Sequence, residues 1–72
     1  MKKSKWETNY TITLSNGDQL TATGEMLNTI RIAFNECADR HYELGCESSA
    51  KTFQKTATEI YNYLGSKGYY ND

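Results

Sequence analysis

The stretches LNTIRIAFNECADRHYEL, residues 27–44, and AKTFQKTATEIYNYL, residues 50–64, decide the fold. In each, apolar or weakly polar positions recur at alternating steps of three and four, which keeps one narrow seam facing a partner helix. These seam positions are Leu27, Ile30, Phe34, Cys37, His41 and Leu44 in the first stretch, and Ala50, Phe53, Ala57, Ile60 and Leu64 in the second. The spacing predicts a helical hairpin with both phenylalanines in its core.

A β-hairpin over residues 6–23 is expected to precede the helices. Even-numbered positions from 6 to 14 are apolar or β-forming and alternate with polar ones, which is the period of a strand with one buried face. A three-residue loop, Ser15-Asn16-Gly17, with its glycine in the left-handed bulge position, pairs Ile12 with Leu20 and collects the apolar residues on one face. A two-residue loop would turn the apolar residues of the second strand to the other side.

The first helix is predicted over residues 25–44. Thr23 or Gly24 can cap its start, and Glu25 lies in the first turn, where the helix dipole favours a negative charge. Gly45 suits the left-handed position just past the last turn.

The second helix is predicted over residues 49–64, with Ser48 or Ser49 as its cap and Gly65 as its end. Residues 65–72 then form a tail. Because the connection between the helices is short, they should be antiparallel neighbours.

Length and composition limit the class of protein. At 72 residues the chain is expected to be a single domain, residues 1–72, of the α+β class in the order ββαα, with the hairpin laid on the two helices. A chain this short buries only about 60% of the surface that its unfolded form exposes, so a homodimer or a larger homo-oligomer is expected. The formal net charge of −1 gives no general attraction to polyanions.

The sequence contains no run of about 18 apolar residues, as a membrane helix requires, and no apolar segment of a signal peptide follows the first lysines. We therefore expect a cytoplasmic protein without a membrane partner. In a reducing compartment its two cysteines are expected to be free thiols.

Cys37, His41 and Cys46 are the candidates for chemistry. The first two stand one helical turn apart and the third follows the helix, so the group can be read as three zinc ligands or as a nucleophile with its base. Neither a CxxC nor an HxxxH motif occurs, and no orienting residue or glycine-rich phosphate loop is evident. We expect no metal, no cofactor and no catalytic residue.

An acidic stripe is predicted on the outer side of the first helix, around the direction of Ile32, and Glu47 continues it past the helix. Its members on the helix are Glu25, Glu36, Asp39 and Glu43. Such a stripe is commonly a solvated face. Its functional interpretation is a surface that meets a basic groove, where charge speeds the encounter and sets the register.

The six tyrosines are the second candidate for binding. Tyr10 and Tyr61 are assigned to the core, and the other four lie at the flanks of the seam or in the tail, where large amphipathic rings make good contact residues. The candidate contact residues among them are Tyr42, Tyr63, Tyr69 and Tyr70. The alternative, which is equally open for the pair in the tail, is that these rings cover the ends of a thin core.

The N-terminal residues offer an alternative function. Lys2, Lys3 and Lys5 precede Trp6, and charge combined with an aromatic ring can bind single-stranded nucleic acid. The alternative to nucleic-acid binding is that Trp6 continues the apolar face of the strand and packs on the helices. We expect this packing role for Trp6.

In style and architecture, a short proline-free chain with a YTITLSNGDQL hairpin leading into two helices resembles the small accessory proteins of phages and mobile elements. That class includes anti-CRISPR and other counter-defence inhibitors. The resemblance implies a non-catalytic protein in the host cytoplasm that binds a host macromolecule or sequesters a small ligand between subunits. A small nucleic-acid-binding regulator is the alternative.

Overall fold

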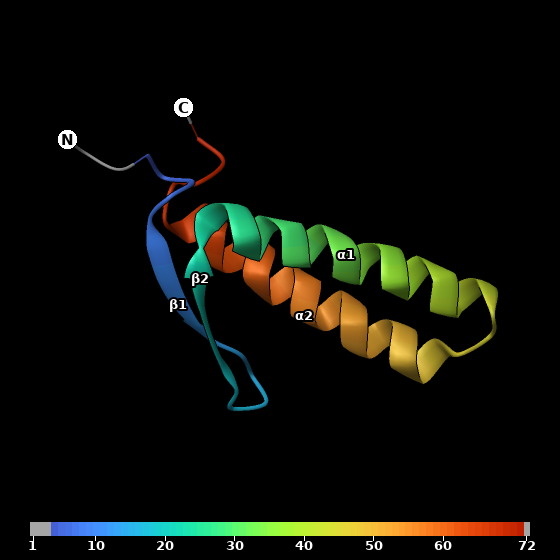
Figure 1. The fold of residues 1–72 in the computed structure, drawn as a ribbon. Coiled ribbons are helices and arrows are strands. Elements are labelled where there is room, and N and C mark those ends of the chain that lie inside the picture. Colours follow the sequence, from blue (N-terminus) through green and yellow to red (C-terminus); the bar gives the residue numbers. More distant parts are fainter. Residues whose placement is uncertain (1–3, 72) are drawn as a thin grey trace.

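The computed structural model describes residues 4–71, which form an antiparallel two-stranded sheet followed by two helices (Figure 1). The elements are β1 (Asn9–Thr13), β2 (Gln19–Thr23), α1 (Gly24–Glu43) and α2 (Glu47–Ser66). This is the predicted α+β arrangement in the order ββαα.

The β-hairpin has the predicted register. Ile12 lies opposite Leu20 and Tyr10 opposite Ala22, so the apolar residues of both strands share one face. The amide of Leu14 donates to the carbonyl oxygen of Asp18 at 2.8 Å, and Gly17 has a φ of +95°. A left-handed residue at this position is the mark of the three-residue loop with a bulge.

Helix α1 starts where its capping residue predicts. The side-chain oxygen of Thr23 accepts a hydrogen bond from the amide of Met26 at 3.1 Å, which satisfies one of the free N–H groups of the first turn. The helix ends at Glu43, and Gly45 follows with a φ of +82°.

Helix α2 is longer at both ends than predicted. It begins at Glu47 after Cys46, whose side chain makes no capping hydrogen bond, so neither of the two serines that follow serves as the cap. It continues through Gly65 to Ser66, and the chain turns at Gly68, which has a φ of +76°. The predicted end of the helix at Gly65 was wrong, because the backbone of Gly65 is helical. The left-handed conformation that commonly follows a helix end occurs at Gly68, three positions later.

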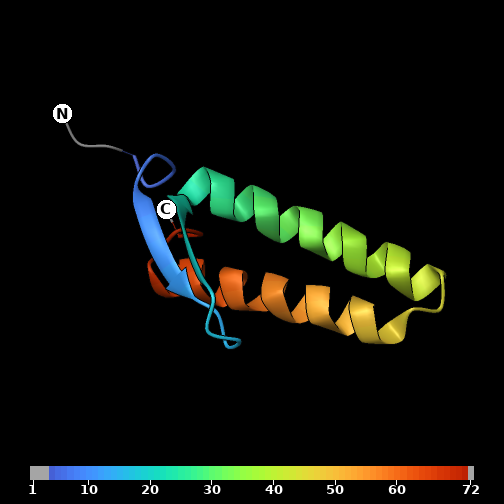
Figure 2. The ribbon, with the colours of Figure 1, turned by 60° about the horizontal axis from the view of Figure 1, so that its bottom comes forward.

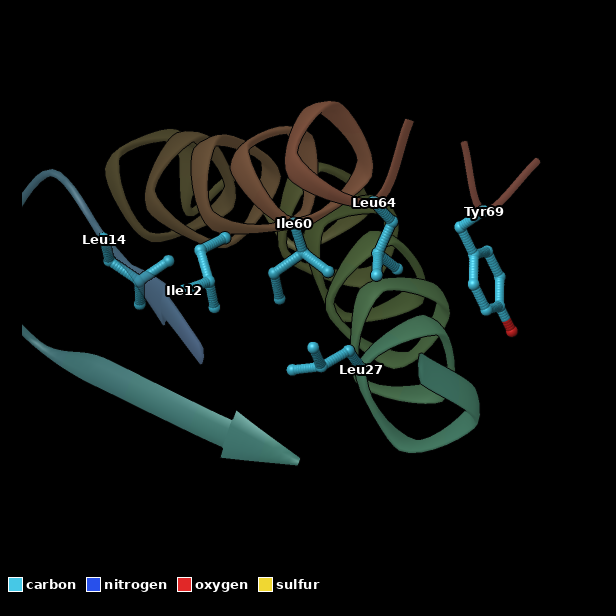
Figure 3. Close-up of a cluster of buried hydrophobic side chains, with 6 residues drawn as sticks. All are labelled: Ile12, Leu14, Leu27, Ile60, Leu64 and Tyr69. Atoms are coloured by element: carbon cyan, nitrogen blue, oxygen red, sulfur yellow. The ribbon is translucent and has the colours of Figure 1, made fainter. Parts of the chain in front are cut away.

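The buried core lies at one end of the molecule, where both strands, the start of α1 and the end of α2 meet (Figure 3). It also includes the tail, because the amide of Tyr69 donates to the carbonyl of Leu64 at 3.0 Å and this turn brings the Tyr69 ring back against the helices. The cluster consists of Ile12, Leu14, Leu27, Ile60, Leu64 and Tyr69.

The sheet covers only part of the helical hairpin. Figures 1 and 2 show both strands beside the start of α1 and the end of α2, with no strand beside the connection between the helices. The molecule is accordingly elongated, 49 × 24 × 16 Å. The core placement of Phe34 and Phe53 was wrong in degree: their rings lie 5.8 Å apart, yet both are only partly buried, because a groove separates them from the tip of the β-hairpin.

Candidate functional site

Three side chains from α1, α2 and the tail form a cluster of mixed aromatic and cationic character, in which both tyrosines are exposed and the arginine is partly buried. The rings of Tyr61 and Tyr70 stack with centroids 4.8 Å apart and an interplanar angle of 27°. The guanidinium of Arg31 lies 5.4 Å from the Tyr61 centroid and 5.7 Å from that of Tyr70. A planar cation at this distance is attracted by the negative ring faces.

Asn28 holds this cluster in place. Its side-chain oxygen accepts from Arg31 Nε at 3.0 Å and from the Tyr70 hydroxyl at 2.7 Å. Because Asn28 and Arg31 are three residues apart on α1, the helix presents both on the same side. We name Asn28, Arg31, Tyr61 and Tyr70 the arginine–tyrosine cluster.

The arginine–tyrosine cluster is open to a ligand. Tyr61 is 50% exposed, and Tyr70 is also exposed. A guanidinium has five N–H donors, and Nε is the one with a hydrogen-bond partner among residues 4–71. The terminal N–H groups of Arg31 can therefore donate to a carboxylate or another planar anion without breaking a contact of the fold.

The acidic stripe is exposed as predicted. Glu36, Asp39 and Glu43 all face solvent on α1, and Ile32 is among the exposed large apolar side chains. Tyr42 is exposed beside them, and its hydroxyl donates to the side-chain oxygen of Gln54 on α2 at 3.4 Å.

Two of the tyrosines predicted at the contact surface lie elsewhere. Tyr69 is only 8% exposed, so its surface placement was wrong. Burial raises the pKa of its phenol, and the nearby phenol of Tyr70 and carboxylate of Glu25 act in the same direction. Tyr63 is half-buried and packs edge-to-face on Tyr10 at 6.2 Å, away from the arginine–tyrosine cluster.

The assignment of Tyr61 to the core was also wrong, since half of this side chain is exposed. Tyr61 faces Arg31 and Tyr70. Both of these residues are distant from Tyr61 in the sequence, so neither pairing has a local sequence signal. The spacing of Asn28 and Arg31 was the one available sign, because an amide can hold an arginine one turn away on a helix.

The aromatic residue of the N-terminal segment is exposed. Trp6 is 57% exposed, so its predicted packing on the helices was wrong. Its backbone carbonyl instead accepts from the amide of Glu25 at 3.0 Å, and the amine of Lys5 donates to the carbonyl of Asn71 at 2.6 Å. Lys2 and Lys3 lie outside the described residues.

Cys37, His41 and Cys46 do not form a ligand set. Both thiols are free and exposed, and within residues 4–71 no three His, Cys, Asp or Glu side chains gather in a metal-binding arrangement. The imidazole Nδ1 of His41 lies 2.8 Å from the carbonyl oxygen of Cys37, and its ring packs on Phe53 at 5.1 Å.

No family model matches the chain, and no curated protein or solved structure matches it. The chain's own geometry therefore carries its functional interpretation. No helix within residues 4–71 combines the length and apolar character needed to cross a membrane.

A second feature lies on the sheet side of the helices. An apolar groove of about 430 Å³ separates the tip of the β-hairpin from the middle of α1 and α2. It is lined by Leu14, Leu20, Ile30, Phe34 and Phe53, with Asn16, Asp18, Thr52 and Thr56 as its polar members.

Proposed function

We propose that this chain is a non-catalytic interaction protein that binds a partner protein through the arginine–tyrosine cluster and the neighbouring acidic stripe. The observation that carries the proposal is the position of the Arg31 guanidinium, stacked beside Tyr61 and Tyr70 and oriented by Asn28. Arginine and tyrosine are enriched among the residues that dominate binding energy at protein interfaces.

Preorganisation supports this proposal. An exposed arginine loses much side-chain freedom when it binds, at a cost of about 0.5–1.5 kcal/mol. The amide of Asn28 and the two rings already restrict Arg31 in the unbound chain, so less freedom remains to be lost. Tyr61 and Tyr70 add apolar area with few rotatable bonds.

Charge suggests the chemistry of the partner. Arg31 fits an acidic side chain, whereas Glu36, Asp39 and Glu43 would steer a basic region toward the adjacent side of α1. The partner protein would therefore present an acidic residue next to a basic groove. The proposed setting is the cytoplasm of a host cell, and the proposed effect is inhibition by coverage of the partner's surface.

The test is affinity capture from host cells with three tagged chains: wild type, Arg31→Ala/Tyr61→Ala, and the control Ser48→Ala, which changes an exposed residue of α2 outside the cluster. We expect a protein that wild type and the control retain and that the double variant loses by about tenfold or more. Equal recovery of every protein by all three chains would contradict the proposal.

Binding of single-stranded nucleic acid is the second candidate function, and the exposure of Trp6 favours it. An exposed indole can stack on a base, and Lys51 and Lys55 on α2 are also exposed. Affinity for labelled DNA or RNA should then fall steeply with salt and be lost in Trp6→Ala. Binding that is absent at low salt would exclude this candidate.

A further inference from the structure

We propose that the uncovered half of the helical hairpin, on the side that carries the sheet, binds a second copy of this chain in antiparallel orientation. Phe34 and Phe53 line the groove next to the sheet, and helical spacing from them defines the rest of this bare half: Cys37, His41 and Leu44 from α1 and its C-terminal cap, and Ser49 from α2. The inference goes beyond the proposed function and does not depend on it, because the arginine–tyrosine cluster lies outside this surface.

The bare half is apolar and accessible. Leu44 is 70% exposed, the largest exposed fraction among the large apolar side chains of the described residues. Phe34 and His41 both pack on Phe53, at 5.8 and 5.1 Å between ring centroids, and all three rings are only partly buried. Phe34 and Phe53 also line the largely apolar groove, and an exposed apolar patch marks an interaction site on a small protein.

The missing cover follows from the width of the sheet. A helix of 20 residues spans about 30 Å, whereas the two strands of the sheet lie only about 5 Å apart. The strands also lie across the helices and not along them (Figures 1 and 2). The sheet therefore shields the end near Leu27 and Ile60, and about half of the helical length stays uncovered.

Charge distinguishes a second copy from other occupants. The six side chains of the bare half include no acid, lysine or arginine, and Asp18 is the one charged residue that lines the adjoining groove, so two copies that meet through the bare half bring no like charges together at its centre. In a two-fold interface the same patch meets itself, and it must therefore be self-complementary. A strongly charged partner would find no opposite charge on this surface.

The dimensions also suit a second copy. A sheet packs about 10 Å from the layer beneath it, and helices pack at 8–10 Å, so the helices of a second copy can continue the layer that the sheet begins. With one sheet at each end, the antiparallel arrangement places Phe34 opposite the second copy's Leu44 and Cys37 opposite the second copy's His41.

The expected interface is small. A bare half about 15 Å long and two helices wide gives a footprint of about 300 Å² on each copy. Two such footprints and the walls of the groove together bury less than about 1,000 Å² of accessible surface, which is below the usual area of a stable specific interface and fits a weak dimer. A dimer with a dissociation constant in the micromolar range is therefore expected.

Sedimentation equilibrium from about 10 to about 500 µM tests this proposal at the affinity expected for such an interface. The apparent mass should rise from 8.2 kDa toward twice that value. Leu44→Arg should remain monomeric, because it brings two like charges into the interface while the exposed position leaves the fold intact. The matched control Ile32→Arg, on the outer side of α1, should dimerise like wild type.

A wild-type chain that remains monomeric throughout this range would overturn the proposal, as would a Leu44→Arg chain that still dimerises. A monomer that takes up an apolar dye in the groove would assign that surface to a small ligand and would also overturn it.

Spin labels test the orientation of the two copies. In a Cys37→Ser chain labelled at Cys46, the antiparallel overlap predicts a distance of about 20–30 Å between the labels, given the rise of 1.5 Å per helical residue. A dimer whose labels are separated by more than about 40 Å would have its loops at opposite ends of the assembly and would overturn this arrangement.

Discussion

The ring of Tyr69 lies directly against Gly24, the first residue of α1. A Cβ atom at Gly24 would approach the Cε2 carbon of Tyr69 and the backbone carbonyl oxygen of Lys5 to 2.7 Å each. The tail and the N-terminal segment thus both close over the start of α1, and only a residue without a side chain fits between them.

Gly24→Ala should therefore destabilise the fold by about 1–3 kcal/mol, because the backbone oxygen of Lys5 cannot move away as a flexible side chain would. Denaturant unfolding measures this change. The control is Gly65→Ala, at a helical position with open space around it, which should stabilise the chain by about 0.5–1 kcal/mol. A Gly24→Ala chain as stable as wild type would contradict the close packing.

Tyr69 should make stability depend on alkaline pH. Because burial raises its pKa above 10.0 in the folded chain, the unfolded chain loses the phenol proton first as the pH rises. Below pH 10 both states hold the proton and the group has no effect. Above pH 10 wild type should lose stability more steeply than Tyr69→Phe, as measured by urea unfolding at a series of pH values, and parallel profiles would contradict this expectation.

Phe34→Ala should cost about 1–2 kcal/mol in dilute solution, less than the 3–5 kcal/mol typical of a fully buried phenylalanine. The reason is that its ring is only partly buried. Thermal unfolding at low concentration measures the cost, and Leu27→Ala, at a fully buried position, serves as the reference with a larger loss. Equal losses in the two variants would show that Phe34 is a core residue after all.

The triple change Glu36→Gln, Asp39→Asn and Glu43→Gln should leave the fold intact, because all three side chains are exposed. Against the partner protein it should slow association and flatten the salt dependence of the association rate, since steering depends on these charges. Stopped-flow or surface-based kinetics measure both quantities. Unchanged association rates would identify the stripe as a solvated face.

The register of the β-hairpin could be predicted because it depends on a local rule. One residue of slippage would turn Leu20 and Ala22 away from Ile12 and Tyr10, so the alternation of apolar residues admits one pairing. The cap at Thr23 and the left-handed Gly45 are likewise local, and both occur where expected.

Other features depend on contacts that are distant in sequence. The spacing of Phe34 and Phe53 indicates which side of each helix faces its neighbour, but it does not indicate how far the sheet extends over them. The burial of Tyr69 depends on where the chain turns after α2, and the turn occurs at Gly68 and not at Gly65.

The arginine–tyrosine cluster was missed for the same reason. Its members come from α1, α2 and the tail, and they meet only after the helices pack. Of the predicted binding residues, Tyr70 belongs to this cluster, and Ile32, Glu36, Asp39, Tyr42 and Glu43 are exposed on α1.

The affinity of the captured partner for Arg31→Ala tests the central claim, that this chain acts by binding through the arginine–tyrosine cluster. Calorimetric titration of wild type and Arg31→Ala with that partner should show a dissociation constant at least about tenfold higher for the variant, as for a residue that dominates an interface. Circular dichroism should confirm that both chains are equally folded. A dissociation constant that differs by less than about twofold would contradict the claim.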